Sequence, residues 1–193
     1  MRLPQRVASF TPAEYLRRER AAEYRSEYYA GEIFAMAGGS PRHSLIKINV
    51  GTVLHRPLLN RPCTAYGSDL RIRVPSGLYT YPDVSVICGD LEFDDELKDT
   101  ILNPTVLVEV LSPTTEAYDR GKKFDHYRQI ASLREYVLVS QDEPRVERFL
   151  RNNDSTWTLA IALPSIGVTL PLSEVFIKVD FTAEEAPSPT TPA

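Results

Sequence analysis

A glutamate in the middle of an apolar run is the residue of this chain that most strongly suggests chemistry. Glu109 lies in the run Thr105-Val-Leu-Val-Glu-Val-Leu111, which is too short and too rich in β-branched residues for a helix. The run predicts a central strand buried on both faces. An ionised carboxylate there loses several kcal/mol of hydration unless it is paired or binds a cation. Glu109 therefore needs a partner, either a lysine or arginine in a structural ion pair or the cation of a reactive site.

A second acid, Asp83, stands at the start of another apolar strand, predicted from Tyr81 to Cys88. Taken alone, Asp83 fits a turn carboxylate at a strand start equally well. If the two strands are neighbours, however, Asp83 and Glu109 converge on one point. Carboxylate oxygens and water are the ligands that Mg²⁺ and Mn²⁺ prefer, so the pair predicts a site for one of these cations.

A helix predicted from Glu116 to Ile130 offers two lysines to this site. At about 100° per residue, Lys123 lies on the flank of the core face and Lys122 points into solvent. Lys123 is therefore the candidate site residue. The alternative is a purely structural role, in which Lys123 forms an i, i+4 salt bridge to Asp119 that contributes about 0.3 to 0.5 kcal/mol if exposed. The predicted core face of this helix consists of Ala117, Gly121, Phe124 and Ala131.

The elements that must position these residues follow from local signals. Thr11, Pro12 and Glu14 form a capping box that predicts a helix from Pro12 to Glu19, and Ser40 caps a second helix through about Leu54. Ala30-Gly31 predicts a hairpin turn between strands. The other predicted strands are Glu27 to Tyr29, Glu32 to Met36, Cys63 to Tyr66, Leu70 to Val74, Tyr136 to Ser140, Arg145 to Leu150 and Trp157 to Ile161. This order predicts an α/β or α+β fold, with a mixed central sheet flanked by helices.

Length and composition predict one soluble domain. The chain has 193 residues, of which 42% are apolar and 25% charged, and no apolar run approaches the roughly 20 residues of a spanning helix. We expect a single domain over residues 1–182, a disordered proline-rich tail over 183–193, and a cytoplasmic location. Cys63 and Cys88 lie 25 residues apart without a CxxC motif, which favours two lone buried thiols over a disulfide or a zinc site.

Charge is unevenly distributed. The net charge of −4 excludes the uniformly basic surface of a constitutive nucleic-acid coat protein. Between Ser40 and Pro75, however, six basic residues face the single acid Asp69, and the segment from Asp90 to Asp99 is strongly acidic. A basic face of this kind permits polyanion binding, although it is equally typical of a solvated surface. The six basic residues are Arg42, Lys47, Arg56, Arg61, Arg71 and Arg73.

These features together resemble a known family. An acid after a proline, a second acid in a buried strand and a nearby lysine resemble the PD-(D/E)xK nuclease superfamily, which has the restriction-endonuclease-like fold. The sequence around these residues is more specific to one family. It contains EYYAGE from Glu27, then His43, then YPDVSVIC, then NPTVLVEVLSPTTEAYDRGKKFDHYRQIASLREYVLV from Asn103. These sequence motifs resemble those of the Uma-two family of restriction-endonuclease-like proteins, over about residues 9–150.

The resemblance implies metal-dependent hydrolysis of DNA phosphodiester bonds. Asp83 and Glu109, with the carbonyl of Val110, would hold Mg²⁺ or Mn²⁺. Leu111 stands where the superfamily has its lysine, and the resemblance implies that Lys123 from the following helix supplies it, to orient water or neutralise developing charge.

Further positions are carried over as supporting residues. Glu27 would complete the acidic cluster, and His43 would contact water or phosphate. Asp69 would be a neighbour of the metal or the partner of Arg71 or Arg73, and Tyr127 would pack beneath Lys123.

Three functions remain open on the sequence alone. The first is a magnesium-dependent DNA endonuclease, expected to be a homodimer because cutting a duplex takes two active sites. The second is a non-catalytic DNA-binding or regulatory module that keeps the nuclease fold, which the acidic net charge favours. The third is an RNA or structure-specific nuclease.

Overall fold

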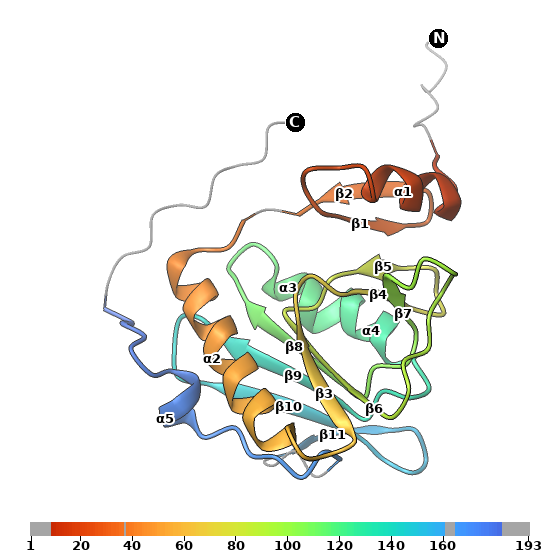
Figure 1. Cartoon of the computed structure of the whole chain (residues 1–193). Coiled ribbons are helices and arrows are strands. Elements are labelled where there is room, and N and C mark those ends of the chain that lie inside the picture. The colour runs from red at the N-terminus through yellow and green to blue at the C-terminus, as the bar shows by residue number, and fades with distance from the viewer. Residues whose placement is uncertain (1–8, 37, 161–164, 183–193) are drawn as a thin grey trace.

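Two sheets and two principal helices make up the protein (Figure 1). The computed structural model describes residues 9–36, 38–160 and 165–182. The predicted fold class, a mixture of helices with a mixed sheet, is confirmed, and the structure adds a second sheet. The helices are α1 (Pro12–Glu19), α2 (Pro41–Leu58), α3 (Glu116–Tyr118), the π-helical turn η1 (Asp119–Lys123), α4 (Phe124–Tyr127) and α5 (Leu172–Val175).

The larger sheet has the strand order β11-β10-β9-β8-β6-β3. Its central strand β8 runs parallel to β9 and antiparallel to β6, and every residue of β8 is buried. The strands of this sheet are β3 (Cys63–Gly67), β6 (Val84–Cys88), β8 (Val106–Leu111), β9 (Glu135–Ser140), β10 (Val146–Arg151) and β11 (Trp157–Ala160).

Successive residues of β8 point to opposite faces of this sheet and enter two separate cores. Val106, Val108 and Val110 belong to the core that contains the buried residues of α2. Leu107 and Leu111 belong to the core that contains Phe124 and Tyr127 of α4. Glu109 lies between Leu107 and Leu111 in the alternation, so its carboxylate is directed toward the segment α3–η1–α4.

The smaller sheet has the strand order β2-β1-β5-β4-β7 and carries the N-terminal hairpin. Helix α1 begins with the predicted capping box, and its Tyr15 stacks on Tyr28 of β1 with ring centroids 5.0 Å apart. This contact fixes α1 to the hairpin, and the pairing of Tyr28 with Tyr79 of β5 joins the hairpin to the rest of the sheet. The strands are β1 (Ser26–Tyr29), β2 (Glu32–Ala35), β4 (Arg71–Arg73), β5 (Tyr79–Thr80) and β7 (Thr100–Ile101).

The predicted strand from Tyr81 to Cys88 is shorter than expected. Tyr79–Thr80 pairs with β4 in the smaller sheet, and the larger sheet is joined only at Val84. The chain passes from one sheet to the other at Tyr81-Pro82-Asp83. Proline has no backbone N–H, so it cannot donate a hydrogen bond to a neighbouring strand. Asp83 therefore lies at the junction of the sheets. Helix α2 continues to Leu58, beyond the predicted end near Leu54.

The predicted core face of the third helix is confirmed at Phe124 and wrong at its other three positions, because the helix contains a π-helical turn. Ala117, Gly121 and Ala131 are exposed, whereas Asp119 and Lys123 are buried. The turn η1 spans Asp119–Lys123, and the wider i→i+5 spacing rotates the residues around it relative to a regular 100° step. Lys123 thus points into the protein, and Lys122 remains exposed as expected.

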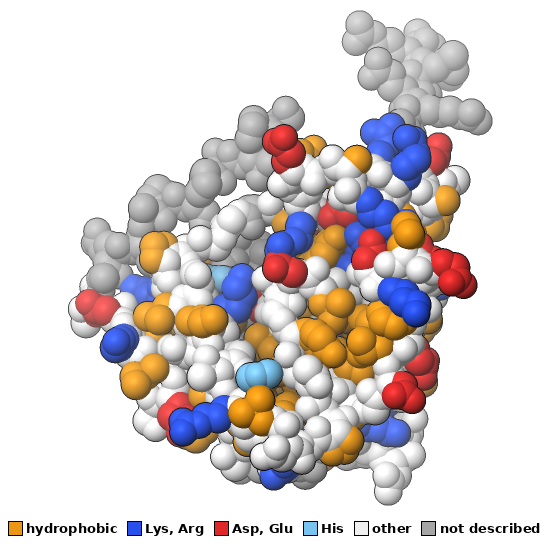
Figure 2. Space-filling model, viewed as in Figure 1, with side chains coloured by type: hydrophobic (Ala, Val, Ile, Leu, Met, Phe, Trp, Pro, Cys, Tyr) orange, Lys and Arg blue, Asp and Glu red, His pale blue; other side chains and the backbone are white. Residues whose placement is uncertain are grey.

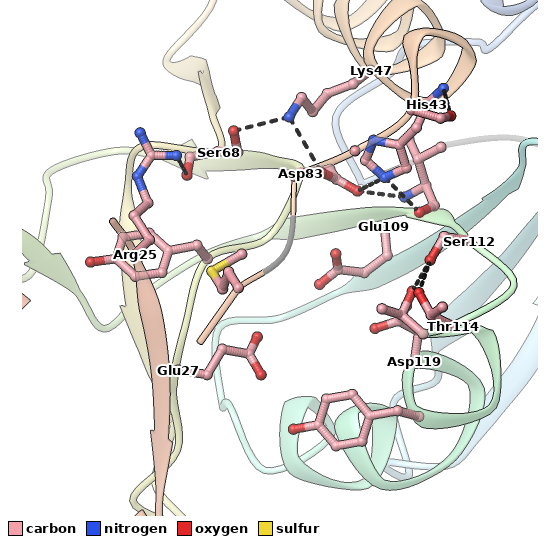
Figure 3. Close-up of a pocket in the computed structure, with 18 of the residues that line it drawn as sticks. Arg25, Glu27, His43, Lys47, Ser68, Asp83, Glu109, Ser112, Thr114 and Asp119 are labelled. Carbon is pink, nitrogen blue, oxygen red and sulfur yellow. Dashed lines mark hydrogen bonds and ion pairs between the residues drawn. The ribbon is translucent and has the colours of Figure 1, made fainter. Parts of the chain in front are cut away.

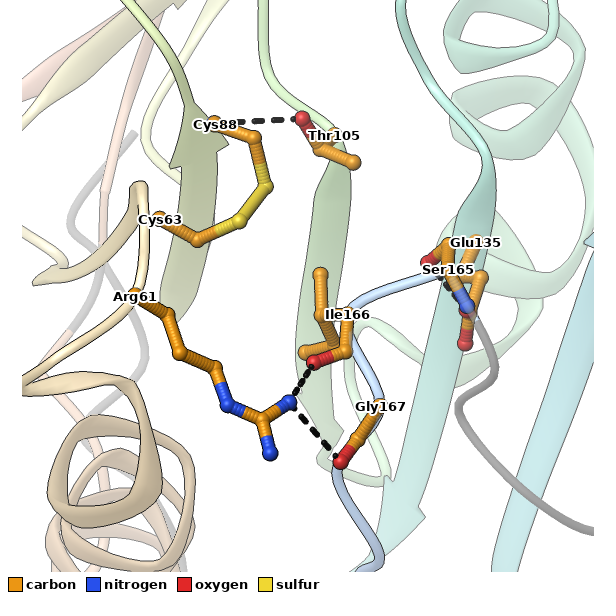
Figure 4. The surroundings of a disulfide bond; sticks show 8 residues. All are labelled: Arg61, Cys63, Cys88, Thr105, Glu135, Ser165, Ile166 and Gly167. Carbon is orange, nitrogen blue, oxygen red and sulfur yellow. Dashed lines mark hydrogen bonds between the residues drawn. A yellow bond between two sulfur atoms is a disulfide. The ribbon is translucent and has the colours of Figure 1, made fainter.

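The two cysteines form a disulfide bond, so the prediction of lone thiols is wrong (Figure 4). Strands β3 and β6 pair antiparallel with Cys63 directly opposite Cys88, and directly opposed residues of such a pair place their side chains on the same face. The two cysteines are 25 residues apart in the chain, and the segment between them forms β4 and β5 of the smaller sheet. Beside the disulfide, the Cys88 amide donates to Thr105 Oγ1 at 3.3 Å.

Two sequence predictions extend beyond the described part of the chain. The proline-rich tail over residues 183–193 lies outside the described residues, as does Ile161, the predicted end of the last strand. No helix within the described ranges combines the length and apolar character needed to cross a bilayer.

Candidate active site

A cleft of about 670 Å³ contains the acids predicted from the sequence. Its walls come from the hairpin β1–β2, the start of α2, the end of β8 and the segment α3–η1 (Figure 3). The predicted site residues that line it are Glu27, His43, Asp83, Glu109, Val110 and Lys123. Residues far apart in the sequence are thereby brought to one concave surface, which is where binding sites generally lie.

The pairing of β6 with β8 brings Asp83 to Glu109. Val84 is opposite Val108, and continuing this antiparallel register by one residue places Asp83 opposite Glu109. The Val110 amide donates to Asp83 Oδ2 at 2.8 Å. Asp83 and Glu109 therefore line the same cleft from adjoining strands (Figure 3).

Lys123 lies at the centre of a buried group of carboxylates. Its Nζ is 2.9 Å from Glu109 Oε1, 3.3 Å from Glu27 Oε1 and 3.4 Å from Asp119 Oδ1. The side chain of Lys123 is only 7% exposed and that of Glu109 only 5%. These contacts are therefore buried, and they differ from the exposed salt bridge between Lys123 and Asp119 that was the structural alternative. An ammonium group has three donors, and three carboxylates lie in reach of them.

Tyr127 and Glu27 complete the support of this group. Tyr127 packs beneath Lys123 as expected, with Lys123 Nζ 6.0 Å from the centre of its ring. Its hydroxyl also donates to Glu109 Oε1 at 2.7 Å. Glu27 reaches across from β1 and accepts a hydrogen bond from Thr80 Oγ1. Glu109 is thus held from one side by a tyrosine and a lysine, while its other neighbours are acids.

The surroundings move the pKa values of these acids in opposite directions. Burial raises the pKa of Glu109 to about 8; Lys123 opposes this rise, and the charges of Asp119 and Asp83 add to it. Burial also raises the pKa of Asp119. For Asp83, burial acts in the same sense but is outweighed by His43 and the Val110 amide, so its pKa lies below the ordinary value. The site therefore has acids of different strength within one cleft.

His43 connects the start of α2 to the end of β8. Ser40 caps α2 and accepts from the His43 amide at 3.0 Å, which fixes the first turn of the helix. The Nε2 atom of His43 lies 3.0 Å from the Val110 carbonyl oxygen and 3.4 Å from Asp83 Oδ2. A Cβ at Gly39 would stand 2.7 Å from His43 Nδ1, so glycine at this position makes room for the ring.

One residue that sequence reasoning proposed is elsewhere, and one that it missed is present. Asp69 pairs with Arg25 and its side chain is 85% exposed. It is not among the residues that line this cleft, and Arg71 and Arg73 pair with Asp99 and Asp94 instead. Lys47 was missed as a site residue, although it stands one helical turn after His43. Its Nζ lies 3.8 Å from Asp83 Oδ1 and donates to Ser68 Oγ at 3.3 Å.

The cleft offers oxygen donors of the kind that a hard divalent cation prefers. Among the described residues, no three His, Cys, Asp or Glu side chains are gathered as a ready cation cage. Two carboxylates and a backbone carbonyl, those of Asp83, Glu109 and Val110, lie at one end of the cleft. Mg²⁺ is usually held by one or two carboxylates and keeps several waters, so this oxygen-only set fits it.

A model of the Uma2 family, described as "Putative restriction endonuclease", matches residues 12–183. This chain belongs to the Uma2 family. The Uma2 match covers both sheets and every residue of the cleft, and it confirms the resemblance seen in the sequence.

Relatives and a solved structure agree with the Uma2 assignment in extent and fold. Two uncharacterised proteins of Synechocystis sp., slr1290 and sll1609, are 36% and 37% identical to this chain over 174 and 150 residues. The alignments cover 86% and 77% of this chain and 90% and 85% of the relatives. A crystal structure from Anabaena variabilis, described as "a putative nuclease belonging to DUF820", shares the fold, with a TM-score of 0.69 at 22% identity over 86% of this chain and 97% of that one.

Proposed function

We propose that this protein is a magnesium- or manganese-dependent endonuclease that hydrolyses phosphodiester bonds of DNA. The observation that carries the proposal is the meeting of Asp83 and Glu109 in a cleft beside the buried Lys123. Two acids on adjoining strands with a nearby lysine are the elements of PD-(D/E)xK chemistry, and the Uma2 family bears a restriction-endonuclease description.

Asp83, Glu109 and the Val110 carbonyl would hold the cation. When bound, it would polarise a phosphoryl oxygen and lower the pKa of the attacking water. The number of acids supports this placement: Glu109, Glu27 and Asp119 surround one lysine, and the charge of Asp83 also acts on Glu109. Burying so many acids is costly without a further cation.

The side chains of the chain itself have separate roles in this proposal. Lys123 fixes Glu109 through the 2.9 Å contact and provides positive charge at the wall of the cleft for the phosphate. His43 holds the Val110 carbonyl and Asp83 in place through Nε2. Glu27 secures Lys123 from the opposite side of the cleft.

Calorimetric titration with Mg²⁺ and Mn²⁺, run beside plasmid nicking, tests the proposal. We expect wild type to bind metal and nick plasmid, and Asp83→Asn and Glu109→Gln to lose both. The matched control is Asp125→Asn, an acid whose side chain is 71% exposed on the outer face of α4, which is expected to keep both properties.

Wild type that binds DNA without binding metal or nicking would refute the enzyme and leave the non-catalytic DNA-binding or regulatory module. Cleavage of an RNA oligonucleotide in preference to DNA would replace the substrate with RNA. The expected homodimer, which double-strand cleavage requires, and the cytoplasmic location stay predictions. Sedimentation equilibrium measures the first and cell fractionation the second.

A further inference from the structure

The basic surplus between Ser40 and Pro75 is not explained by the catalytic cleft alone. Most of its cations are bound within the protein: Arg71 and Arg73 pair with acids, and Arg61 donates to the carbonyls of Ile166 and Gly167 (Figure 4). Arg56 differs, because within the described ranges its side chain has no ion pair or hydrogen bond. Its guanidinium group is therefore available to a ligand.

Arg56 lines a second groove, of about 640 Å³, between α2 and the edge strand β3. These two elements lie side by side on the face that Figures 1 and 2 show. The groove is continuous with the catalytic cleft, because Lys47, Ser68 and Asp83 line both. A chain bound with its reacting group at Asp83 thus has a path away from the site along α2.

The lining of this groove combines cations with an apolar surface. Lys47, His55 and Arg56 contribute nitrogen donors, and Ile48 and Leu59 contribute apolar area. Ile48 is 64% exposed and Leu59 66%, which is unusual for large apolar side chains beside a concave surface. Asp69 also lines the groove, but its charge is countered by Arg25. Acidic side chains lie instead along the side of the molecule that carries β7 (Figure 2).

We propose that this groove binds single-stranded DNA, the unpaired strand on one side of the scissile phosphate. The inference rests on the proposed function and names its substrate class. A strand with unpaired bases offers phosphates to cations and base faces to apolar side chains, which is how sequence-tolerant single-strand sites bind. In a duplex the base faces are stacked and out of reach of Ile48 and Leu59. The volume is that of a pocket for one drug-sized ligand, roughly 300 to 1,000 Å³, and so fits a nucleotide unit better than a double helix.

Fluorescence anisotropy with a labelled oligodeoxythymidine and a labelled hairpin duplex, both in EDTA, tests the inference. We expect wild type to bind the single strand more tightly than the duplex. Arg56→Glu should weaken single-strand binding about tenfold and reduce the slope of log K against log salt by roughly 1, because one phosphate contact is lost. Ile48→Ala should weaken it about threefold with the slope unchanged, because it removes apolar contact only.

Matched controls separate these effects from general changes. Arg134→Glu reverses the charge of an exposed arginine that directly precedes β9, and β8 and β6 lie between β9 and β3 in the sheet. Leu97→Ala truncates a side chain that is 66% exposed in the acidic segment. Both should bind like wild type. Circular dichroism melts confirm that each variant is folded.

The outcomes distinguish the inference from the proposed function. If Arg56→Glu and Arg134→Glu bind the single strand equally, or if wild type prefers the duplex, the groove is not a single-strand site. If wild type nicks plasmid but does not bind the single strand, the inference fails and the endonuclease stands. If it neither binds nor nicks DNA, both fail.

Discussion

Lys123 is surrounded by more carboxyl groups than one ammonium group can neutralise. Glu109, Glu27 and Asp119 all lie within 3.4 Å of its Nζ, and all of these side chains are buried or nearly so. A buried charge that loses its partner is far more costly than an exposed one, because neither water nor salt replaces the contact. The contribution of Lys123 to stability is therefore expected to be large, whatever its part in catalysis.

Replacing Lys123 by methionine should lower the free energy of unfolding by about 3 kcal/mol, because it leaves three buried acids without a cation. Urea unfolding at neutral pH measures the change. The control is Lys122→Met, which alters an exposed neighbour on the same turn and should cost less than about 0.5 kcal/mol. Equal losses in the two variants would mean that the group of acids does not depend on Lys123.

The raised pKa of Glu109 predicts a pH dependence of stability. Its pKa is about 8 in the folded protein and 4.5 ordinarily, so between pH 6 and 8 the folded state binds one proton more than the unfolded state. Stability must then fall as the pH rises, by up to about 3 kcal/mol over this interval. Asp119, whose pKa is also raised, acts in the same direction.

Thermal or urea unfolding in EDTA, compared between wild type and Glu109→Gln, isolates the contribution of Glu109. The variant cannot ionise at this position, so its stability should decline less steeply from pH 6 to 8. A decline as steep as that of wild type would show that Glu109 is already ionised at pH 6.

At the scale of elements, the π-helical turn decides which residues of the third helix face the site. Asp119 and Lys123 point inward because the turn is wider than a regular α-helical turn. A regular period, applied to the sequence, placed Gly121 in the core; it is exposed instead, and a Cβ there would meet nothing within 4 Å. The glycine is therefore not needed for packing.

Gly121→Ala should raise the free energy of unfolding by about 0.5 to 1 kcal/mol, because alanine loses less backbone entropy in a helix. The contrasting variant is Gly31→Ala in the β1–β2 turn, where φ is +93° and a Cβ would collide with Ser9. It should destabilise the protein by about 1 kcal/mol or more. Chemical denaturation measures the free energy of unfolding of both variants and shows whether each change has the expected sign. Destabilisation by Gly121→Ala would indicate that the π-helical turn requires glycine.

At the scale of the whole molecule, the disulfide joins β3 to β6, the one strand that pairs with β3 among the described residues. Edge strands are held on one side only, so a covalent link there restrains the β3 wall of the second groove. Closing a loop of about 25 residues stabilises a protein by about 3 kcal/mol in the chain-entropy description.

Reduction with dithiothreitol should therefore lower the thermal midpoint of wild type, and it should leave Cys63→Ser/Cys88→Ser unaffected. Thiol titration under denaturing conditions accompanies the melts: no reactive thiol is expected before reduction and two are expected after it. Free thiols in the untreated protein would mean that the cysteines are unpaired in solution.

The sequence by itself determined the elements whose signals are local and the residues whose burial is costly. The capping box predicted α1, and the apolar run around Glu109 predicted a buried strand, because caps and β-branched runs act over a few residues. It also indicated Asp83, His43 and Lys123, all of which line one cleft.

Only the tertiary structure decided the relations between distant segments. Strand register pairs Cys63 with Cys88 and brings Asp83 beside Glu109, and no local pattern encodes it. The ion pair of Asp69 joins it to Arg25, a residue 44 positions earlier in the chain. The inward turn of Lys123 depends on a π-helical turn that a regular helical period does not predict. Strand pairing and packing bring these groups together, because the energy that fixes them comes from contacts between residues far apart in the chain.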